Sequence, residues 1–239
     1  MTKTTLSNSP LCVIVGAGPG NGESIARQFS QAGYNIALIA RNTERIIALA
    51  DQIDSAKAYP CDVTDNLEVE STFKVIIADY GRIDALIYNA GKGVWGDALL
   101  IERSDFENAW RLNACGAFDV VRQVLPIMQA NSSGNIIFLG ATASRRGSAN
   151  SVAYAAAKAA QRSLAESLAK AYGPKGIHVS YVIIDAVVGG PLMKAKLTDR
   201  PDDFFCEPND IAKTVFMLIQ QSRTAWTFEL DIRPFKENW

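Results

Sequence analysis

The sequence predicts a doubly wound α/β fold, in which a parallel seven-stranded sheet carries helices on both faces. Two observations lead to this prediction. Short apolar runs rich in β-branched residues alternate along the chain with segments of helical periodicity. The chain has 239 residues, of which 48% are hydrophobic and 21% charged, and this is an ordinary globular composition. Because one α/β domain commonly reaches about 250 residues, we expect a single domain over residues 1–239.

The predicted strands are short apolar segments that end in polar or glycine-containing turns. They lie at 11–15, 35–40, 57–61, 84–88, 135–139, 177–184 and 225–232. Between the first two, Ile25, Phe29 and Ala32 recur with helical spacing, and similar patterns follow the later strands. Strands that alternate with helices in this way form right-handed βαβ units, whose helices cover both faces of a parallel sheet.

Two predicted helices begin with a capping pattern. Asp65 is followed three residues later by Glu68, and Ser104 is followed by Glu107. In a capping box the first side chain accepts from the helix backbone and the second reaches back to the first residue. We therefore expect Asp65 and Ser104 to cap helices.

Two segments fit no regular element. Residues 1–9 are polar and contain no apolar core of a secretory signal, so we expect a flexible tail there. Residues 189–208 begin with Gly189-Gly190-Pro191 and are long for a connection inside a compact domain. Long connections of this kind are typical of lids, and we expect 189–208 to cover a substrate.

Charge and cysteine content exclude several classes of protein. The net charge is −1, from 24 basic and 25 acidic residues, which disfavours nucleic acid and anionic membranes as partners. No run of about 18 apolar residues occurs. Cys12, Cys61, Cys115 and Cys206 form no CxxC pair, and the one histidine, His178, alternates with apolar neighbours, so we expect no metal site and a structural histidine. A soluble, cytoplasmic protein is expected.

A glycine-rich turn follows the first predicted strand directly and leads into a helix. It contains Gly16, Gly18, Gly20, Asn21 and Gly22. Glycines permit a tight turn, and the helix N-terminus presents free N–H groups to a pyrophosphate. A turn that serves only the geometry of the chain is the alternative. The position after the first strand favours a Rossmann-type dinucleotide site.

The end of the second strand indicates which dinucleotide binds. An acidic residue there accepts from a ribose 2′-hydroxyl, whereas an arginine suits a 2′-phosphate. The chain has Ala40-Arg41-Asn42 at this place, with no carboxylate. We expect Arg41 to bind the phosphate of NADP, with NAD still possible, and a solvated surface arginine is the alternative.

Tyr154 and Lys158 have the i, i+4 spacing that places both on one helix face. An ammonium one turn away favours the phenolate, so we expect the pKa of Tyr154 to lie below its usual value near 10. The pair would then act as a tuned acid and base. Tyr-x-x-x-Lys pairs also occur on exposed helices, and this is the alternative interpretation.

These motifs resemble the short-chain dehydrogenase/reductase family, in its short non-extended branch, from Pro10 to about Ile232. Stretches 140–147 and 225–234 are similar to a poorly characterised subgroup of it. Three further motifs match in order: Asp62-Val63 after the third strand, Asn89-Ala90-Gly91 after the fourth, and Asn113 within Leu112-Asn113-x-x-Gly116. The resemblance implies that the first two motifs contribute to the cofactor site.

The resemblance also implies the roles of the catalytic residues. Tyr154 would protonate a carbonyl oxygen or deprotonate an alcohol, and Lys158 would hold the nicotinamide ribose. Asn113 would anchor a water that relays protons to Lys158. The family further implies a homodimer or homotetramer acting on a small carbonyl or alcohol compound.

The chain departs from the family at two places. Where the family has a catalytic serine, thirteen residues before the tyrosine, the chain has Ala141, and we expect Thr142 to supply the hydroxyl, with Ser144 as the alternative. Asp185-Ala186 replaces a Pro-Gly pair, and Gly190 replaces a threonine that often contacts the carboxamide. The positioning of the nicotinamide is therefore left open.

Our interpretation is an NADP-preferring oxidoreductase of a carbonyl or alcohol. A non-catalytic dinucleotide-binding sensor or scaffold is the competing class, and Ala141 is the feature that supports it. A Rossmann-type methyltransferase is disfavoured, because its chemistry does not need the pair of Tyr154 and Lys158. The aromatic residues Phe235 and Trp239 fit either core packing or a subunit interface.

Overall fold

The protein, described here from a computed structural model over residues 9–237, has the predicted parallel sheet of seven strands. The strand order is β3-β2-β1-β4-β5-β6-β9. The strands are β1 (Leu11–Val15), β2 (Asn35–Ala40), β3 (Ala56–Pro60), β4 (Ala85–Tyr88), β5 (Gly134–Ala141), β6 (Ile177–Ile184) and β9 (Glu229–Ile232). Every residue of β1, β4 and β6 is buried, which explains why β1 and β4 are apolar without alternation, whereas β6 also buries the polar His178 and Ser180.

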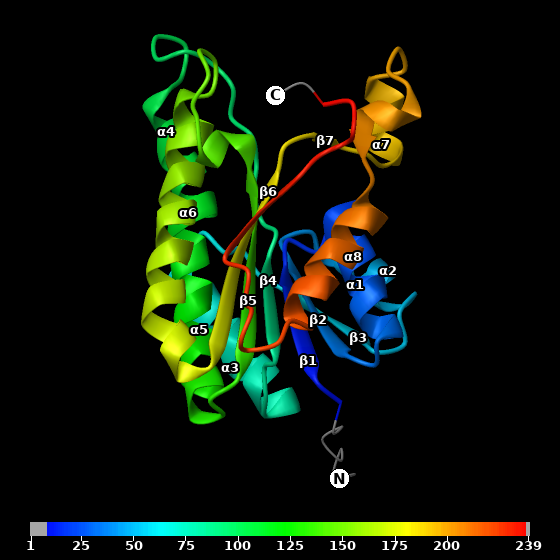
Figure 1. The fold of residues 1–239 in the computed structure, drawn as a ribbon, viewed down its shortest axis with the longest axis vertical. Helices are drawn as coiled ribbons and strands as arrows, with labels where there is room; N and C mark the ends of the chain where they lie inside the picture. The colour runs from blue at the N-terminus through cyan, green and yellow to red at the C-terminus, as the bar shows by residue number, and fades with distance from the viewer. Residues whose placement is uncertain (1–8, 238–239) are drawn as a thin grey trace.

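Helices cover both faces of the sheet (Figure 1). Helices α1, α2 and α8 pack on one face, and α3, α5 and α6 pack on the other. Their bounds are α1 (Asn21–Gln31), α2 (Thr43–Ala50), α3 (Asn66–Tyr80), α5 (Gly116–Ala130), α6 (Val152–Tyr172) and α8 (Pro208–Ile219). A further helix, α4 (Arg103–Trp110), continues through a π-helical turn, Arg111–Cys115, into α5. The doubly wound arrangement is as predicted.

The strand order places a crevice at the carboxyl ends of β1 and β4. β1 pairs with β2 on one side and with β4 on the other, so the chain leaves β1 in one direction and later returns to its opposite edge. Ligands of doubly wound folds bind at such a switch point, outside the carboxyl ends of the strands. The glycine-rich turn follows β1, and Asn89 follows β4.

One of the two predicted helix caps is confirmed. Asp65 precedes α3, and its carboxylate accepts from the backbone N–H groups of Leu67 at 2.9 Å and Glu68 at 3.2 Å. The prediction for Ser104 is wrong, because α4 begins at Arg103 and Glu102 is its N-cap. The Arg103 guanidinium donates to the Glu107 carboxylate at 2.7 Å, so Glu107 is engaged inside the helix rather than at its start.

The last strand is shorter than predicted: β9 begins at Glu229 instead of residue 225. The backbone before it bonds to side chains, since the Thr227 carbonyl accepts from the Ser180 hydroxyl at 2.6 Å. The same carbonyl lies 2.9 Å from Nε2 of His178, whose ring stacks on Trp226 with centroids 4.8 Å apart. His178 is a buried structural residue, as predicted.

The segment 189–208 holds more secondary structure than predicted. It contains α7 (Pro191–Lys196), a 3₁₀ turn at Asp202–Phe204 and β8 (Phe205–Cys206). β8 pairs with β7 (Val187–Val188), and the Gly189 N–H donates to the Cys206 carbonyl at 2.8 Å. The segment is therefore a small folded unit, and its function as a lid stays a prediction.

Some predictions concern the ends and the surface of the chain. Residues 1–8 of the expected tail, and Trp239, lie outside the described residues. Phe235 is 83% exposed, so the interpretation that it packs in the core is wrong. Cys12 and Cys61 are buried, as expected. No helix among residues 9–237 combines the length and apolar character needed to cross a bilayer.

Candidate active site

The glycine-rich turn between β1 and α1 is shaped by close backbone contacts. Gly16 has φ +88°, and a Cβ there would lie 2.5 Å from the backbone nitrogen of Ala90. Gly20, with φ +95°, precedes α1, whose first turn has no side-chain cap. The Glu23 N–H donates to the Gly18 carbonyl at 3.0 Å, and the N–H groups of Asn21 and Gly22 before it are the ones that suit an anion. A Cβ at Gly18 or Gly20 would meet nothing within 4 Å, so this side of the turn is open.

A cleft of about 600 Å³ lies against this turn. Gly16 and Gly18 line one part of it, and Arg41 and Arg45 line another. Further lining residues come from the ends of β2, β3 and β4 and from the π-helical turn; they include Ala40, Asn42, Val63, Ala90, Gly91, Lys92 and Leu112. Clefts of this size at a switch point accommodate cofactors. The sequence analysis missed Arg45, whose place one turn beyond Arg41, on α2, was the available signal.

The end of the cleft next to β2 carries charge. Nη1 of Arg41 lies 3.7 Å from Oδ2 of Asp62, and both side chains are partly exposed. An exposed ion pair of this length is weak. The other carboxylate oxygen of Asp62 accepts from the Thr64 hydroxyl at 2.8 Å and from its N–H at 3.0 Å, which fixes the Asp62 side chain. Arg41 therefore remains free to turn toward an anion.

Asn89 joins β4 to the glycine-rich turn. Its Nδ2 donates to the Gly16 carbonyl at 2.7 Å, and its backbone N–H donates to the Val15 carbonyl at 2.8 Å. The side chain thus holds the turn against the end of β4. The structure brings Asn89, Ala90 and Gly91 together with the predicted glycines at one edge of the sheet.

Lys158 is buried beneath the cleft, on α6. Its Nζ donates to the Leu139 carbonyl and to Oε1 of Gln161, each at 2.9 Å. A Cβ added to Gly91, which lines the cleft, would lie 3.5 Å from Nζ. Burial lowers the pKa of Lys158 to about 7. The amine therefore reaches the cleft floor and is only partly protonated near neutral pH.

Tyr154 lies one turn before Lys158, and its ring packs against Trp95 with centroids 5.5 Å apart. Burial raises the pKa of Tyr154 above its usual value. The expected lowering by Lys158 is therefore wrong for the protein without ligand. Lys158 directs its N–H groups to Leu139 and Gln161, and with its pKa lowered to about 7 it is only partly charged near neutral pH, which reduces its power to favour the phenolate.

Asn113 lies fully buried in the π-helical turn. Its Nδ2 donates to the Ala109 carbonyl at 2.9 Å, and its backbone carbonyl accepts from Nε2 of Gln161 at 2.8 Å. Oδ1 of Asn113 is buried without a hydrogen-bond partner among the described residues. It would lie 3.1 Å from a Cβ at Gly91. Single π-helical turns often mark functional sites, because they displace one residue from the regular helix.

The two candidate replacements for the missing serine both have partners elsewhere. The Thr142 hydroxyl donates to Oδ1 of Asp185, and Oδ2 of Asp185 lies 3.2 Å from the Arg233 guanidinium. The Ser144 hydroxyl donates to the Ala141 carbonyl at 2.6 Å. The role of Thr142 stays a prediction, but its hydroxyl hydrogen is engaged by Asp185 in this structure.

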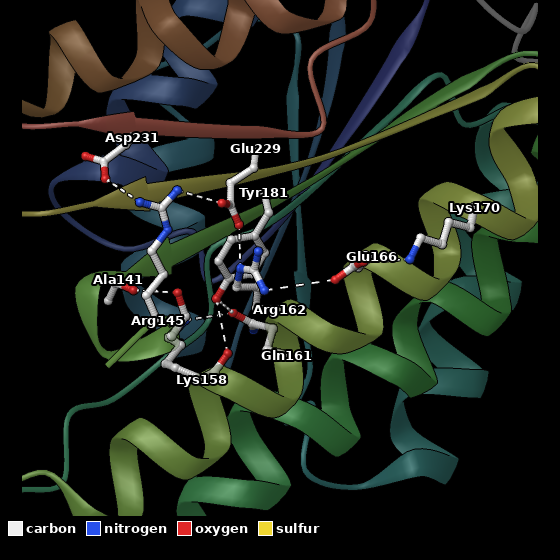
Figure 2. Close-up of polar contacts among 11 residues, drawn as sticks. Ala141, Arg145, Lys158, Gln161, Arg162, Glu166, Lys170, Tyr181, Glu229 and Asp231 are labelled. Atoms are coloured by element: carbon white, nitrogen blue, oxygen red, sulfur yellow. Dashed lines mark hydrogen bonds and ion pairs between the residues drawn. The ribbon is translucent and has the colours of Figure 1, made fainter. Parts of the chain in front are cut away.

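Ion pairs hold the turn after β5 against the last strand (Figure 2). Arg145 binds Glu229 at 2.6 Å and Asp231 at 3.1 Å. Arg162, on α6, binds the second oxygen of Glu229. Arg233 binds Asp231 as well as Asp185. The turn that carries Thr142 and Ser144 is thereby tied to both α6 and β9.

Gln161 is a second residue of this site that the sequence analysis missed. It is fully buried and bonds to both Lys158 and Asn113. The available signal was a glutamine on the buried face of an alanine-rich helix, one turn after Lys158. Such a residue needs buried partners for its amide.

Comparison with known proteins agrees with this geometry. Residues 11–200 match the family model of short chain dehydrogenases. A crystal structure of a short-chain dehydrogenase from Rhodopseudomonas palustris has 30% identity and a TM-score of 0.83, covering 96% of this chain and 100% of that one. A metagenomic short-chain oxidoreductase in complex with NADP has 26% identity and a TM-score of 0.83, covering 97% and 99% of the two chains.

Curated relatives have similar identity. An uncharacterized oxidoreductase of Staphylococcus aureus strain USA300 is 28% identical over 96% of this chain and 99% of its own length. Carbonyl reductase family member 4 of Xenopus laevis is 29% identical, over 89% of this chain and 92% of its own length. With a family model that covers most of its length and the fold described above, the chain belongs to the short-chain dehydrogenase family of oxidoreductases.

Proposed function

We propose that the protein is an NADP(H)-dependent oxidoreductase that interconverts a carbonyl compound and an alcohol. The observation that carries the proposal is the position of Lys158 and Tyr154. The Lys158 amine reaches the floor of the cleft beneath Gly91, and Tyr154 precedes it by one turn of the same helix. A phenol beside a buried amine, at the end of a dinucleotide cleft, suits proton transfer to a carbonyl oxygen.

The residues of the cleft fit a dinucleotide. Oδ1 of Asn21, at the start of α1, is a buried acceptor without a partner among the described residues. The open side of Gly18 leaves room for a pyrophosphate at the uncapped helix start. Arg41 and Arg45 supply positive charge at the adenosine end, which supports a preference for the 2′-phosphate of NADP over NAD. The NADP complex of the metagenomic relative agrees with this choice.

In carbonyl reduction, bound NADPH would supply the hydride to the carbonyl carbon. The Tyr154 phenol gives its proton to the carbonyl oxygen as the electrons of the π bond collect there. Because burial raises the pKa of Tyr154, the phenol keeps its proton at neutral pH and is ready to act as the acid. Lys158, when protonated, stabilises the phenolate that forms. Alcohol oxidation follows the reverse path.

The surroundings of Tyr154 favour an apolar or aromatic substrate. Trp95 packs on the Tyr154 ring and still has 65% of its surface exposed. An exposed indole beside the proton donor offers a flat apolar surface to a substrate ring or chain. We propose that 189–208 closes over this place, and that the protein works in the cytoplasm as a homodimer or homotetramer.

A second function has one observation in its favour. The chain has Ala141 where the family has its serine, and both nearby hydroxyls are engaged by Asp185 and by the Ala141 carbonyl. A dinucleotide-binding sensor without catalysis would tolerate this arrangement. The cost of losing one transition-state donor is about 10²- to 10³-fold in rate, which slows an enzyme without abolishing its activity.

A panel of aldehydes, ketones and alcohols, assayed by NADPH consumption or formation, tests the proposal. We expect turnover of at least one apolar carbonyl compound, its loss in Tyr154→Phe, and NADPH affinity unchanged in that variant. Tyr172→Phe, at the far end of the same helix, is the matched control and should keep full activity. Undiminished turnover in Tyr154→Phe would remove the catalytic assignment. NADPH binding without turnover of any compound would favour the sensor.

A further inference from the structure

Gln161 is a fully buried polar residue whose side chain is bonded at both ends. Its Nε2 donates to the Asn113 carbonyl at 2.8 Å, and its Oε1 accepts from Nζ of Lys158 at 2.9 Å. The Tyr181 hydroxyl lies 3.3 Å from the same Oε1 (Figure 2). The carboxamide thus links the π-helical turn, α6 and β6 beneath the cleft.

The contacts of Lys158 leave one direction open. An ammonium has three N–H donors, and Leu139 and Gln161 accept from two of them. Nζ of Lys158 and the unpartnered Oδ1 of Asn113 both approach the space next to Gly91, at 3.5 and 3.1 Å from a Cβ built there. The third donor and the orphan acceptor therefore border the same part of the cleft floor.

The groups around Lys158 leave Gln161 as one of the few acceptors that can stabilise its charged form. Tyr154 lies one turn before Lys158 on α6, and the Tyr181 hydroxyl, on β6, lies 3.3 Å from the backbone carbonyl of Lys158. Burial raises the pKa of both phenols, so both are neutral near pH 7. β5 presents only the Leu139 carbonyl, and the π-helical turn presents the uncharged Asn113. Among the described residues, two uncharged acceptors thus stabilise the buried ammonium, and one of them is Gln161.

We propose that Gln161 is a positioning residue, which directs the Lys158 amine toward the cleft and sets the protonation of that amine. It does so because its carboxamide, instead of a bridging water, links Lys158 to Asn113. Water both accepts and donates protons, whereas a carboxamide nitrogen does not accept one. Protons for Lys158 therefore arrive from the cleft side, past Asn113 Oδ1, rather than through the π-helical turn. The catalytic consequence rests on the proposed function, but the effect on Lys158 itself does not.

Two variants with side chains of similar size test how residue 161 affects the protonation of Lys158. Gln161→Glu places an anion beside the ammonium, and Gln161→Met removes the acceptor while keeping the length of the side chain. The readout is an NMR titration of lysine Cε signals in the protein without cofactor, in which Lys158→Met identifies the signal of interest. Gln129→Glu, at an exposed position on α5, is the matched control for the added charge.

In the unmodified protein Lys158 should titrate near pH 7. Gln161→Glu should raise the midpoint by about 1 to 3 pH units, and Gln161→Met should lower it by about one pH unit. The control should leave the midpoint unchanged. If one variant does not fold, the other alone decides. A midpoint that stays at the unmodified value in the folded variants overturns the proposal.

The pH profile of carbonyl reduction gives a second readout. The protonated amine is the form that stabilises the Tyr154 phenolate. The midpoint of the alkaline limb in the plot of kcat against pH should therefore move to higher pH in Gln161→Glu and to lower pH in Gln161→Met. A fall in kcat at every pH, with the limb unmoved, would mean a merely structural role and would contradict the proposal. The NMR titration does not depend on turnover. Its failure is therefore distinct from the failure of the proposed function.

Discussion

The hydroxyl of Thr142 donates to the carboxylate of Asp185, the residue that follows β6. Arg233 holds the other oxygen of the same carboxylate at 3.2 Å, so Asp185 is itself fixed. A hydroxyl that already donates to a carboxylate has no second hydrogen for a substrate oxygen. The hydroxyl that the family places at residue 141 therefore has no free substitute at Thr142 in this structure.

Restoring a hydroxyl at Ala141 should increase the rate. We expect Ala141→Ser to raise kcat by up to about 10²-fold, which is the usual contribution of one hydrogen bond donated to the transition state. Asp185→Asn is the companion variant, because it weakens the hold on Thr142 and should give a smaller gain. Steady-state kinetics on one identified carbonyl substrate decide the matter. An unchanged kcat in Ala141→Ser would mean that another group already donates to the carbonyl oxygen.

The preference for NADPH should depend on Arg41. We expect Arg41→Ala to weaken the binding of NADPH by about 1 to 3 kcal/mol, the range of a charge-assisted hydrogen bond. The binding of NADH should be almost unaffected. Arg45→Ala should have a smaller effect in the same direction. Calorimetry with both cofactors measures this, with Arg103→Ala on α4 as the control for loss of an exposed arginine. Equal affinities for the two cofactors in the unmodified protein would contradict the assignment.

Trp95 should matter for the substrate and not for the cofactor. Removing the indole in Trp95→Ala should raise KM for aromatic carbonyl compounds by about tenfold, in line with the loss of one aromatic contact. NADPH affinity should stay the same, because Trp95 lies beside Tyr154 rather than among the residues that line the dinucleotide cleft. Trp110→Ala, also partly exposed, is the control. An unchanged KM for every substrate would remove Trp95 from the substrate site.

The segment 189–208 should become ordered when ligands bind. Its α7 is short, and Lys194 holds it to the following turn through exposed ion pairs with Asp202 at 2.9 Å and Glu207 at 2.8 Å. Such contacts are weak, so its amides should exchange rapidly without ligand and slowly with NADPH and substrate. Hydrogen exchange measures this against the amides of β1. Equal protection of both segments without ligand would rule out the lid.

Burial of Lys158 should make stability depend on pH. The pKa of Lys158 is about 7 in the folded protein and near 10.5 when exposed, so the unfolded chain binds more protons between these values. The free energy of unfolding should therefore rise with pH from about 7 to about 10.5, and the benefit is lost as pH falls through 7. Denaturation of the unmodified protein and of Lys158→Met over this range should show the rise only in the former. If the free energy of unfolding changes with pH in the same way in both proteins, Lys158 is not the source of the pH dependence.

The sequence predicted the central strands well because burial of both faces makes β1 and β4 apolar, and the turn after β1 needs a glycine at Gly16, where a Cβ would collide with the backbone of Ala90. The end of the chain was harder: Ala225-Trp226-Thr227 has strand composition, but its backbone bonds to the side chains of Ser180 and Gln221. The lowered pKa expected for Tyr154 was wrong because spacing along a helix does not reveal that Lys158 turns toward Gln161. That contact depends on β6 and the π-helical turn, which lie far away in the sequence.

The ion pairs of Glu229 depend on a residue near the end of the chain. One carboxylate binds both Arg145, beside the turn that carries Thr142 and Ser144, and Arg162, on the helix of Tyr154. β9 is the last strand of the sheet to leave the ribosome. A nascent chain that ends before Glu229 leaves both arginines without this partner, although its first six strands and their helices are already synthesised. The ion pairs that tie the turn carrying Thr142 and Ser144 to β9 can therefore form only after this last strand has been synthesised.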